Sequence, residues 1–206
     1  YPLMENKQVV TLNGSDKLLV EFNYSTYTDI ADYVYNIKMY GYTPIIAHIE
    51  RYTYIDKYSV IAIKENGGLI QVNANTIVGK LGKNTQTFVL RLIKDGLVDF
   101  VSSDIHFGRE NVLLEAYNIV KKKFGVNVAN NLFTENAKKE ILSKINNLLK
   151  ENGNEELNQQ FYLAGLVETK DLKDMISENK IISMYEEEQI DFNKLIEIYN
   201  NDLITE

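Results

Sequence analysis

Short apolar runs alternate with segments of helical periodicity along the first hundred residues. Between the runs, apolar side chains recur at intervals of three and four residues, as a helix with one buried face requires. Asp29 caps the first such segment, and these segments end at glycines 41, 67 and 96. The pattern predicts helices over about 29–40, 55–65 and 86–94. It also predicts four strands: Lys17–Phe22, Thr43–His48, Leu69–Asn73 and Leu97–Val101.

Strands that alternate with helices predict an α/β fold with a parallel sheet and right-handed crossovers. A β/α barrel and an open doubly wound sheet both fit this order, and both place their functional site at the carboxyl ends of the strands. Polar residues lie at or just beyond the carboxyl end of each predicted strand: Glu21, His48 with Arg51, Gln71 with Asn73, and Asp104 with His106. We therefore expect these side chains to share one site.

Asp104 and His106 follow the apolar run Leu97–Val101 directly. A carboxylate and an imidazole are good ligands for a divalent metal. The same pair could also be a structural hydrogen bond between a buried histidine and an aspartate. The polar residues after the other three strands favour the metal site. Gln71 and Asn73 are expected to support the site by hydrogen bonds.

The second half of the chain carries fewer chemical signals. Amphipathic patterns predict helices over Glu110–Lys123 and Thr134–Lys150, and Lys121–Lys123 complements the dipole at the end of the first of them. Asn152–Asn154 reads as a linker. We therefore expect two parts, residues 1–151 and a helical extension, 152–206, in which Glu186–Glu188 forms an exposed acidic face.

Composition excludes several functional classes. The chain has 206 residues, of which 45% are hydrophobic and 25% charged, as in soluble globular proteins. It holds 13 of its 29 acidic but only 4 of its 22 basic residues after position 151, so the body is nearly neutral and shows no basic stripe for nucleic acid. The sequence contains no apolar run long enough to predict a membrane-spanning helix. The absence of cysteine excludes thiolate chemistry and fits a cytoplasmic location.

Three motifs in order carry a resemblance to a known family. They are Ala47-His48-Ile49-Glu50-Arg51-Tyr52, Gln71-Val72-Asn73-Ala74 and Ser103-Asp104-Ile105-His106, preceded by Leu19-Val20-Glu21-Phe22. They resemble the PHP family, and within it the bacterial manganese-dependent protein-tyrosine phosphatases encoded with capsular and exopolysaccharide genes. The resemblance implies a distorted (β/α)7 barrel of the PHP type that holds three metal ions. This chain would form part of such a barrel, followed by the acidic helical extension.

The resemblance also implies roles for individual residues. Glu21, His48, Asp104 and His106 would bind divalent metal ions, expected to be manganese. Arg51 would hold the substrate phosphate, and Arg109 would be either a second phosphate contact or a solvated loop charge. The substrate would be a phosphotyrosine protein such as the tail of a capsule-type tyrosine kinase. Ile49, Ile105 and Phe107 differ from the family pattern, but none of these positions supplies a ligand.

The family pattern includes further ligands upstream, beginning with His-x-His, and no residue before Glu21 supplies them. Three arrangements remain compatible: a fragment of a longer enzyme, a second copy or partner chain that completes the barrel, or an extension that folds over the open side. We expect the parent protein to be a phosphatase and this chain alone to be weakly active or inactive. The alternative is a regulatory module that binds phosphoproteins without hydrolysing them. Related PHP enzymes that act on histidinol phosphate or nucleic-acid ends are less similar in the His48–Arg51 motif.

Overall fold

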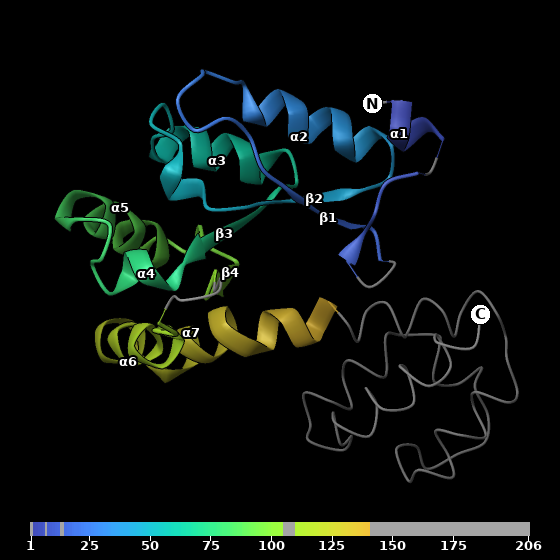
Figure 1. Ribbon diagram of the computed structural model, residues 1–206. Helices are drawn as coiled ribbons and strands as arrows, with labels where there is room; N and C mark the ends of the chain where they lie inside the picture. Colours follow the sequence, from blue (N-terminus) through green and yellow to red (C-terminus); the bar gives the residue numbers. More distant parts are fainter. Residues whose placement is uncertain (1, 7, 13–14, 105–109, 141–206) are drawn as a thin grey trace, which may run out of the picture. The chain divides into compact units, whose positions relative to one another are not determined.

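The computed structural model describes residues 2–6, 8–12, 15–104 and 110–140 (Figure 1). The chain divides into two compact units, residues 1–137 and 138–206. The helices and strands given below lie in the first unit, except that the last helix is described to residue 140. The expected boundary at residue 151 lies outside the described residues, as do the predicted linker and extension, so this division of the chain stays a prediction.

Four parallel strands form the sheet, in the order β1-β2-β3-β4. Neighbouring strands in space are therefore also neighbours in the sequence, which is the order of consecutive βα units that wind in one direction. A doubly wound sheet would instead reverse its strand order at a switch point. The strands are β1 (Lys17–Val20), β2 (Thr43–Ile46), β3 (Leu69–Asn73) and β4 (Phe100–Ser102).

Three of the strands are shorter than, or shifted from, their predicted bounds. β1 ends before Phe22 because the Phe22 N–H donates to the Tyr52 hydroxyl, 3.0 Å away, and leaves the ladder. β4 begins at Phe100 because the Asp99 carboxylate accepts the Ile70 N–H at 2.7 Å, where a strand carbonyl would otherwise bind. β2 ends at Ile46, and the predicted β3 bounds are confirmed.

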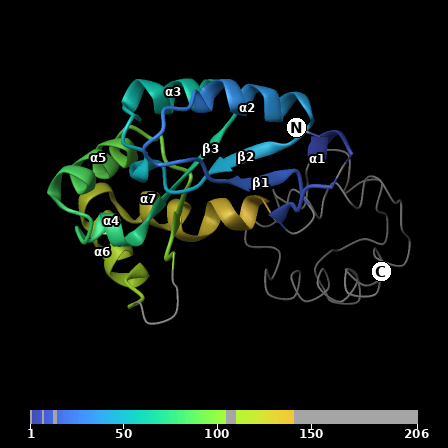
Figure 2. The same cartoon turned by 45° about the horizontal axis from the view of Figure 1, so that its top comes forward.

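The helices between the strands follow the predicted order. α2 and α3 lie side by side along the strands (Figures 1 and 2). Asp29 caps α2, as predicted, and its carboxylate accepts from the Asp32 N–H at 3.2 Å. The helices are α1 (Pro2–Glu5), α2 (Ile30–Met39), η2 (Ile49–Arg51), α3 (Lys57–Glu65), α4 (Ala74–Ile77), α5 (Lys83–Lys94), α6 (Leu113–Phe124), α7 (Val126–Asn130) and the π-helix η3 (Asn131–Glu135).

Some helix ends differ from the prediction for local reasons. α3 begins two residues late because Asp56 and Ser59 form a capping box, in which the Asp56 carboxylate accepts the Ser59 N–H at 2.8 Å. α5 begins three residues early, at Lys83, and α6 begins three residues late, at Leu113. The helix predicted from Thr134 starts earlier, within η3, and is described to residue 140.

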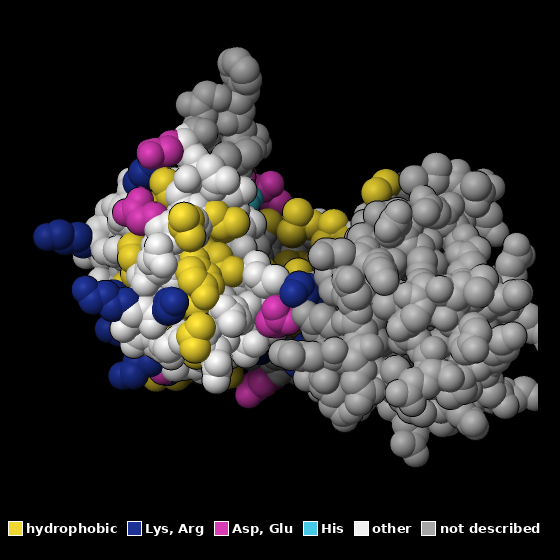
Figure 3. All heavy atoms as spheres, turned by 90° about the horizontal axis from the view of Figure 1, so that it is seen from below, with side chains coloured by type: hydrophobic (Ala, Val, Ile, Leu, Met, Phe, Trp, Pro, Cys, Tyr) yellow, Lys and Arg dark blue, Asp and Glu magenta, His cyan; other side chains and the backbone are white. Residues whose placement is uncertain are grey.

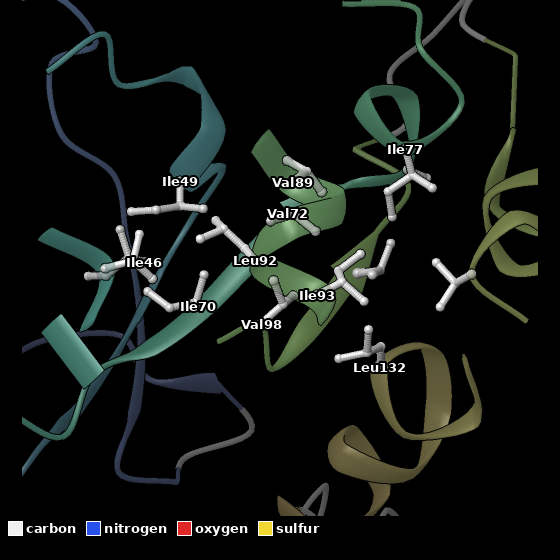
Figure 4. Packing of buried hydrophobic residues seen from close by; sticks show 14 of the residues in the cluster. Ile46, Ile49, Ile70, Val72, Ile77, Val89, Leu92, Ile93, Val98 and Leu132 are labelled. Atoms are coloured by element: carbon white, nitrogen blue, oxygen red, sulfur yellow. The ribbon is translucent and has the colours of Figure 1, made fainter. Parts of the chain in front are cut away.

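The apolar core lies between the sheet and its helices (Figure 4). Ile46 of β2, Ile70 of β3 and Leu92 of α5 are fully buried. Burying one such side chain contributes roughly 1.5–3 kcal/mol. Gly68 stands at a tight point beside this core, where a Cβ atom would lie 2.8 Å from the Ile63 Cγ2. The core therefore fixes the strands whose carboxyl ends carry the predicted site residues.

Basic side chains gather along one edge of the described part (Figure 3). Arg91 and Lys94 stand in the last turn of α5, and Lys121–Lys123 occupies the last turn of α6, as predicted. Cations at these positions complement the partial negative charge of a helix end. Among the described residues, no helix is both long enough and apolar enough to cross a membrane.

Candidate metal and phosphate site

His48 stands just beyond the end of β2 in an uncommon backbone conformation. Its φ of 51° places it in the left-handed region, which costs energy for a residue with a side chain. Asp104, which follows β4, has a φ of 48°. Gln71 helps to hold the turn at His48, because its Oε1 accepts the His48 N–H at 2.7 Å. Backbone strain of this kind gathers at functional sites.

Asp104 brings the predicted metal and phosphate residues together. Its Oδ2 lies 2.5 Å from Arg51 Nη2, and its Oδ1 lies 3.9 Å from His48 Nε2. The Asp104 side chain is 10% exposed and that of Arg51 29% exposed. Burial lowers the pKa of Arg51, but its contacts with Tyr24 and Asp104 outweigh this effect, so the pKa is raised overall. Arg51 is therefore a fixed positive charge, which Asp104 holds at the end of β4 and which remains partly exposed to solvent.

The Asn73 amide links the imidazole to the carboxylate. Its Nδ2 donates to Asp104 Oδ2 at 3.2 Å, and its Oδ1 lies 2.8 Å from His48 Nδ1. Because an ionised carboxylate only accepts hydrogen bonds, the atom that faces Asp104 must be the amide nitrogen. The amide oxygen then faces His48 and accepts a hydrogen bond from Nδ1–H. In the neutral form of His48 the hydrogen therefore lies on Nδ1, and Nε2 faces Asp104.

Gln71 and Glu50 hold Asn73 from behind. Gln71 Nε2 donates to Asn73 Oδ1 at 3.1 Å and also contacts the Ser102 hydroxyl. Glu50 Oε1 accepts the Asn73 N–H at 2.9 Å and the Thr76 hydroxyl at 2.8 Å. Gln71 and Asn73 thus support the site by hydrogen bonds, as the sequence indicated.

Sequence reasoning gave no role to Glu50. It is 9% exposed, and its Oε2 is buried without a hydrogen-bond partner. Burial raises the pKa of Glu50 despite the hydrogen bonds from Asn73 and Thr76. Its place in the His48–Arg51 motif, one residue from the arginine, was the available signal.

Glu21 lies on the other side of Arg51, and Tyr24 connects the two. The Tyr24 hydroxyl donates to Glu21 Oε1, and Arg51 Nη1 lies 3.4 Å from the same hydroxyl. The Arg51 guanidinium also stands over the Tyr24 ring, 5.8 Å from its centroid. Tyr24 had no predicted role, because a tyrosine in a loop carries no distinctive sequence signal.

The structure thus connects Glu21, His48, Arg51 and Asp104 through one hydrogen-bonded network. Its links run from Glu21 through Tyr24 and Arg51 to Asp104, and from there through Asn73 to His48. The other two predicted site residues, His106 and Arg109, lie outside the described residues. Within residues 2–6, 8–12, 15–104 and 110–140, no three histidine, aspartate or glutamate side chains group closely enough to hold a metal ion. The four-ligand site therefore stays a prediction.

The donor atoms of His48 and Asp104 nevertheless suit a cation. In the neutral ring the Nε2 lone pair faces a carboxylate oxygen at 3.9 Å, and a proton or a metal cation between these two electron-rich atoms would relieve their repulsion. The support from Asn73 is also typical of metal-binding histidines, which donate their other ring N–H to an oxygen that fixes the tautomer. The two residues fit a divalent metal as a partial ligand set.

Comparison with known proteins agrees with this chemistry. The tyrosine-protein phosphatase CpsB of Streptococcus agalactiae is 38% identical over 141 residues, which cover 64% of this chain and 58% of that protein. CpsB of Streptococcus pneumoniae is 32% identical over 152 residues, 69% of this chain and 63% of that protein. The tyrosine-protein phosphatase YwqE of Bacillus subtilis is 31% identical over 139 residues, 65% of this chain and 54% of that protein.

A solved structure also resembles this fold. It comes from work on YwqE of Bacillus subtilis and CpsB of Streptococcus pneumoniae, described as metal-dependent tyrosine phosphatases. The match has a TM-score of 0.57 at 28% identity and covers 62% of this chain and 54% of that structure. The chain spans only about half to two thirds of the length of these relatives. The family model for capsular polysaccharide synthesis, CpsB/CapC, matches residues 1–143, and the chain belongs to that family.

Proposed function

We propose that this chain supplies the phosphate-binding arginine and part of the metal site of a metal-dependent protein-tyrosine phosphatase that acts in capsule or exopolysaccharide synthesis. The observation that carries the proposal is the cluster of His48, Arg51 and Asp104, three motif residues from two strand ends. The Asp104 carboxylate lies within 4 Å of both His48 Nε2 and Arg51 Nη2. The relatives named as tyrosine-protein phosphatases support the same activity.

Each residue has a distinct role in this proposal. Arg51 uses the N–H groups that Asp104 and Tyr24 do not occupy to grip the phosphate oxygens. His48 and Asp104, together with Glu21 and His106, hold divalent metal, which we propose is manganese. When bound, the metal supplies positive charge against the phosphate oxygens as the ester bond breaks. Asn73 fixes the tautomer that leaves His48 Nε2 able to bind a cation.

The fold supports a partial barrel. The order β1-β2-β3-β4 is that of successive units in a β/α barrel, and we propose that these strands form part of a PHP-type barrel. The remaining strands would come from a longer parent chain, a second copy or a partner. We further propose that the 206-residue chain alone is weakly active or inactive, since it contains only two histidines and spans 58% of its Streptococcus agalactiae relative.

Phosphate release from a phosphotyrosine peptide with added manganese tests the proposal. The 206-residue chain and a longer parent chain that includes the upstream sequence are assayed side by side. We expect turnover by the parent that is lost in the Arg51→Ala and His48→Ala variants, and little turnover by the shorter chain. An inactive parent would overturn the phosphatase assignment. Full activity of the shorter chain would overturn only the claim that it is incomplete.

One observation favours a second function, the binding of phosphoproteins without hydrolysis. Protein groups alone position Arg51, through Asp104 at 2.5 Å and Tyr24 at 3.4 Å. A phosphate could therefore be gripped before any metal binds. A pull-down with a phosphotyrosine peptide in excess chelator separates the two functions. Retained binding by the parent chain, without turnover after manganese is restored, would favour the binding module.

A further inference from the structure

We propose that the groove between the starts of α2 and α3 binds a neutral aromatic side chain that flanks the phosphorylated tyrosine of a peptide substrate. This inference rests on the proposed phosphate-binding role of Arg51 and specifies the substrate further. The groove has a volume of about 260 Å³. Pockets for drug-sized ligands begin at roughly 300 Å³, so this one suits a single side chain.

The groove has an apolar floor and aromatic walls. Ile30 and Ile63 are buried beneath it. Tyr54 lies at one side, while Tyr27 and Tyr58 line it with side chains that are 74% and 77% exposed. Tyrosine presents a large, stiff apolar surface and a hydroxyl, which suits contact with another aromatic ring. Two tyrosines this exposed contribute little to the core and remain available to a ligand.

A continuous series of ring contacts leads from this groove to Arg51. The ring centroids are 5.6 Å apart for Tyr27 and Tyr54, 5.9 Å for Tyr54 and Tyr52, and 5.7 Å for Tyr52 and Tyr24. The last ring, Tyr24, contacts the Arg51 guanidinium. Tyr52, in the middle of this series, is 3% exposed, so the contacts run partly through the core. The groove and the phosphate site are neighbours on the side of the sheet where the strands end and the following helices begin.

The spacing of the two sites suits one peptide. Three ring steps of less than 6 Å place Tyr27 within about 17 Å of Tyr24. An extended peptide advances about 3.4 Å per residue, so the flanking side chain would lie within roughly five residues of the phosphotyrosine. A peptide gripped at Arg51 could reach the groove without a turn.

Charge disfavours an acidic side chain, and the apolar floor of Ile30 and Ile63 disfavours burying any charged one. Asp29 is the one charged residue among those described as lining the groove. Its carboxylate would repel an acidic flanking residue. No lysine, arginine or histidine lines the described groove to offset that repulsion. The chemistry therefore favours phenylalanine or tyrosine in the substrate over aspartate or glutamate.

Binding of non-hydrolysable phosphotyrosine peptides to the 206-residue chain tests this proposal. Each peptide carries a difluoromethylene phosphonate in a Gly-Ser background, with one phenylalanine, one glutamate or neither placed within five residues of it. Fluorescence anisotropy in the presence of manganese gives the affinities. We expect one phenylalanine position to tighten binding by about 2- to 12-fold, the range that an aromatic pair contributes, and glutamate to give no gain.

Matched variants locate the effect. Tyr27→Ser with Tyr58→Ser should remove the phenylalanine gain and leave the affinity for the plain peptide unchanged. Tyr35→Ser, which changes a 53% exposed tyrosine of α2 outside the groove, should keep the gain. No phenylalanine gain, or a gain that survives the double substitution, would overturn the groove assignment.

Unphosphorylated versions of the same peptides separate this proposal from the proposed function. A phenylalanine gain that needs Tyr27 and Tyr58 but not the phosphonate would support the groove and contradict phosphate binding at Arg51. Phosphonate-dependent binding with no phenylalanine gain would do the reverse. Binding of no peptide would overturn both.

Discussion

Replacing Asn73 by leucine tests how the site presents His48 to a metal ion. Leucine has a similar size and shape but neither accepts from His48 Nδ1 nor donates to Asp104 Oδ2, contacts that are now 2.8 and 3.2 Å long. Asn73 is fully buried, so no water replaces these partners without rearrangement. We expect the imidazole to lose its preference for the tautomer with hydrogen on Nδ1.

The size of the effect follows from the lost contacts. A hydrogen bond contributes about 1 kcal/mol net, and the loss of about 1 kcal/mol alters the ratio of the two tautomers by about fivefold. A metal ion also loses the orientation of the ring and of Asp104. Removal of such an outer partner typically weakens metal affinity by roughly 10- to 100-fold. We therefore expect manganese affinity to fall by at least tenfold.

Two measurements check this prediction. Because the chain has only two histidines, His106→Gln leaves a single imidazole, whose ¹⁵N NMR shifts report which ring nitrogen carries hydrogen. Competition with a chromophoric chelator gives the manganese affinity. Asn127→Leu, at an exposed position of α7, serves as the control. Two results would refute the reasoning: hydrogen on His48 Nε2 in the protein that retains Asn73, or unchanged manganese affinity in Asn73→Leu.

Four further predictions concern stability and phosphate binding. Tyr52→Phe should lower the free energy of unfolding by roughly 2–4 kcal/mol, because the hydroxyl accepts from Phe22 N and donates to Ala47 O, both at 3.0 Å. Chemical denaturation measures this change, and Tyr58→Phe, at an exposed tyrosine, is the control. Burial raises the pKa of Tyr52 from 10.0 to about 12. The protonated hydroxyl therefore stabilises the fold fully below pH 10.0, and this contribution to the free energy of unfolding declines as the pH rises to about 12. The decline should be smaller in Tyr52→Phe, and an equal decline in both proteins would contradict this prediction. Gly68→Ala should destabilise by about 1–3 kcal/mol, since its Cβ would stand 2.8 Å from Ile63 Cγ2, and an unchanged unfolding midpoint would contradict this contact. Arg51→Lys should raise KM for a phosphotyrosine peptide in the longer parent chain, because lysine lacks the planar fork, whereas an equal KM would count against bidentate binding.

The order of the strands and the polar residues at their ends could be predicted from the sequence. The spacing of apolar residues is a local property, and the glycines after each helix mark where one unit stops. The predicted bounds failed where a side chain replaced a backbone partner. Asp99 occupies the N–H of Ile70, and Tyr52 occupies that of Phe22. Those contacts join residues about 30 positions apart, and sequence periodicity carries no information about them.

The candidate site was foreseen in part. The motifs singled out His48, Arg51 and Asp104, and these three side chains meet. The order of the hydrogen bonds through Asn73 and Glu50 could not be foreseen, because it depends on which amide atom faces which neighbour. The role of Tyr24 between Glu21 and Arg51 was missed because a tyrosine in a loop carries no distinctive sequence signal. His106 and Arg109 remain predictions, and so does the number of metal ions.

The left-handed backbone at His48 and Asp104 sets the stability of the fold against the proposed metal site. Each such residue costs of order 1 kcal/mol relative to glycine, which adopts this conformation freely. Selection of this protein for thermal tolerance alone would thus tend to accept glycine at both positions and discard the imidazole and carboxylate together. Efforts to stabilise this chain should therefore keep residues 48 and 104 constant and look for stabilising changes in the apolar layer behind the strands.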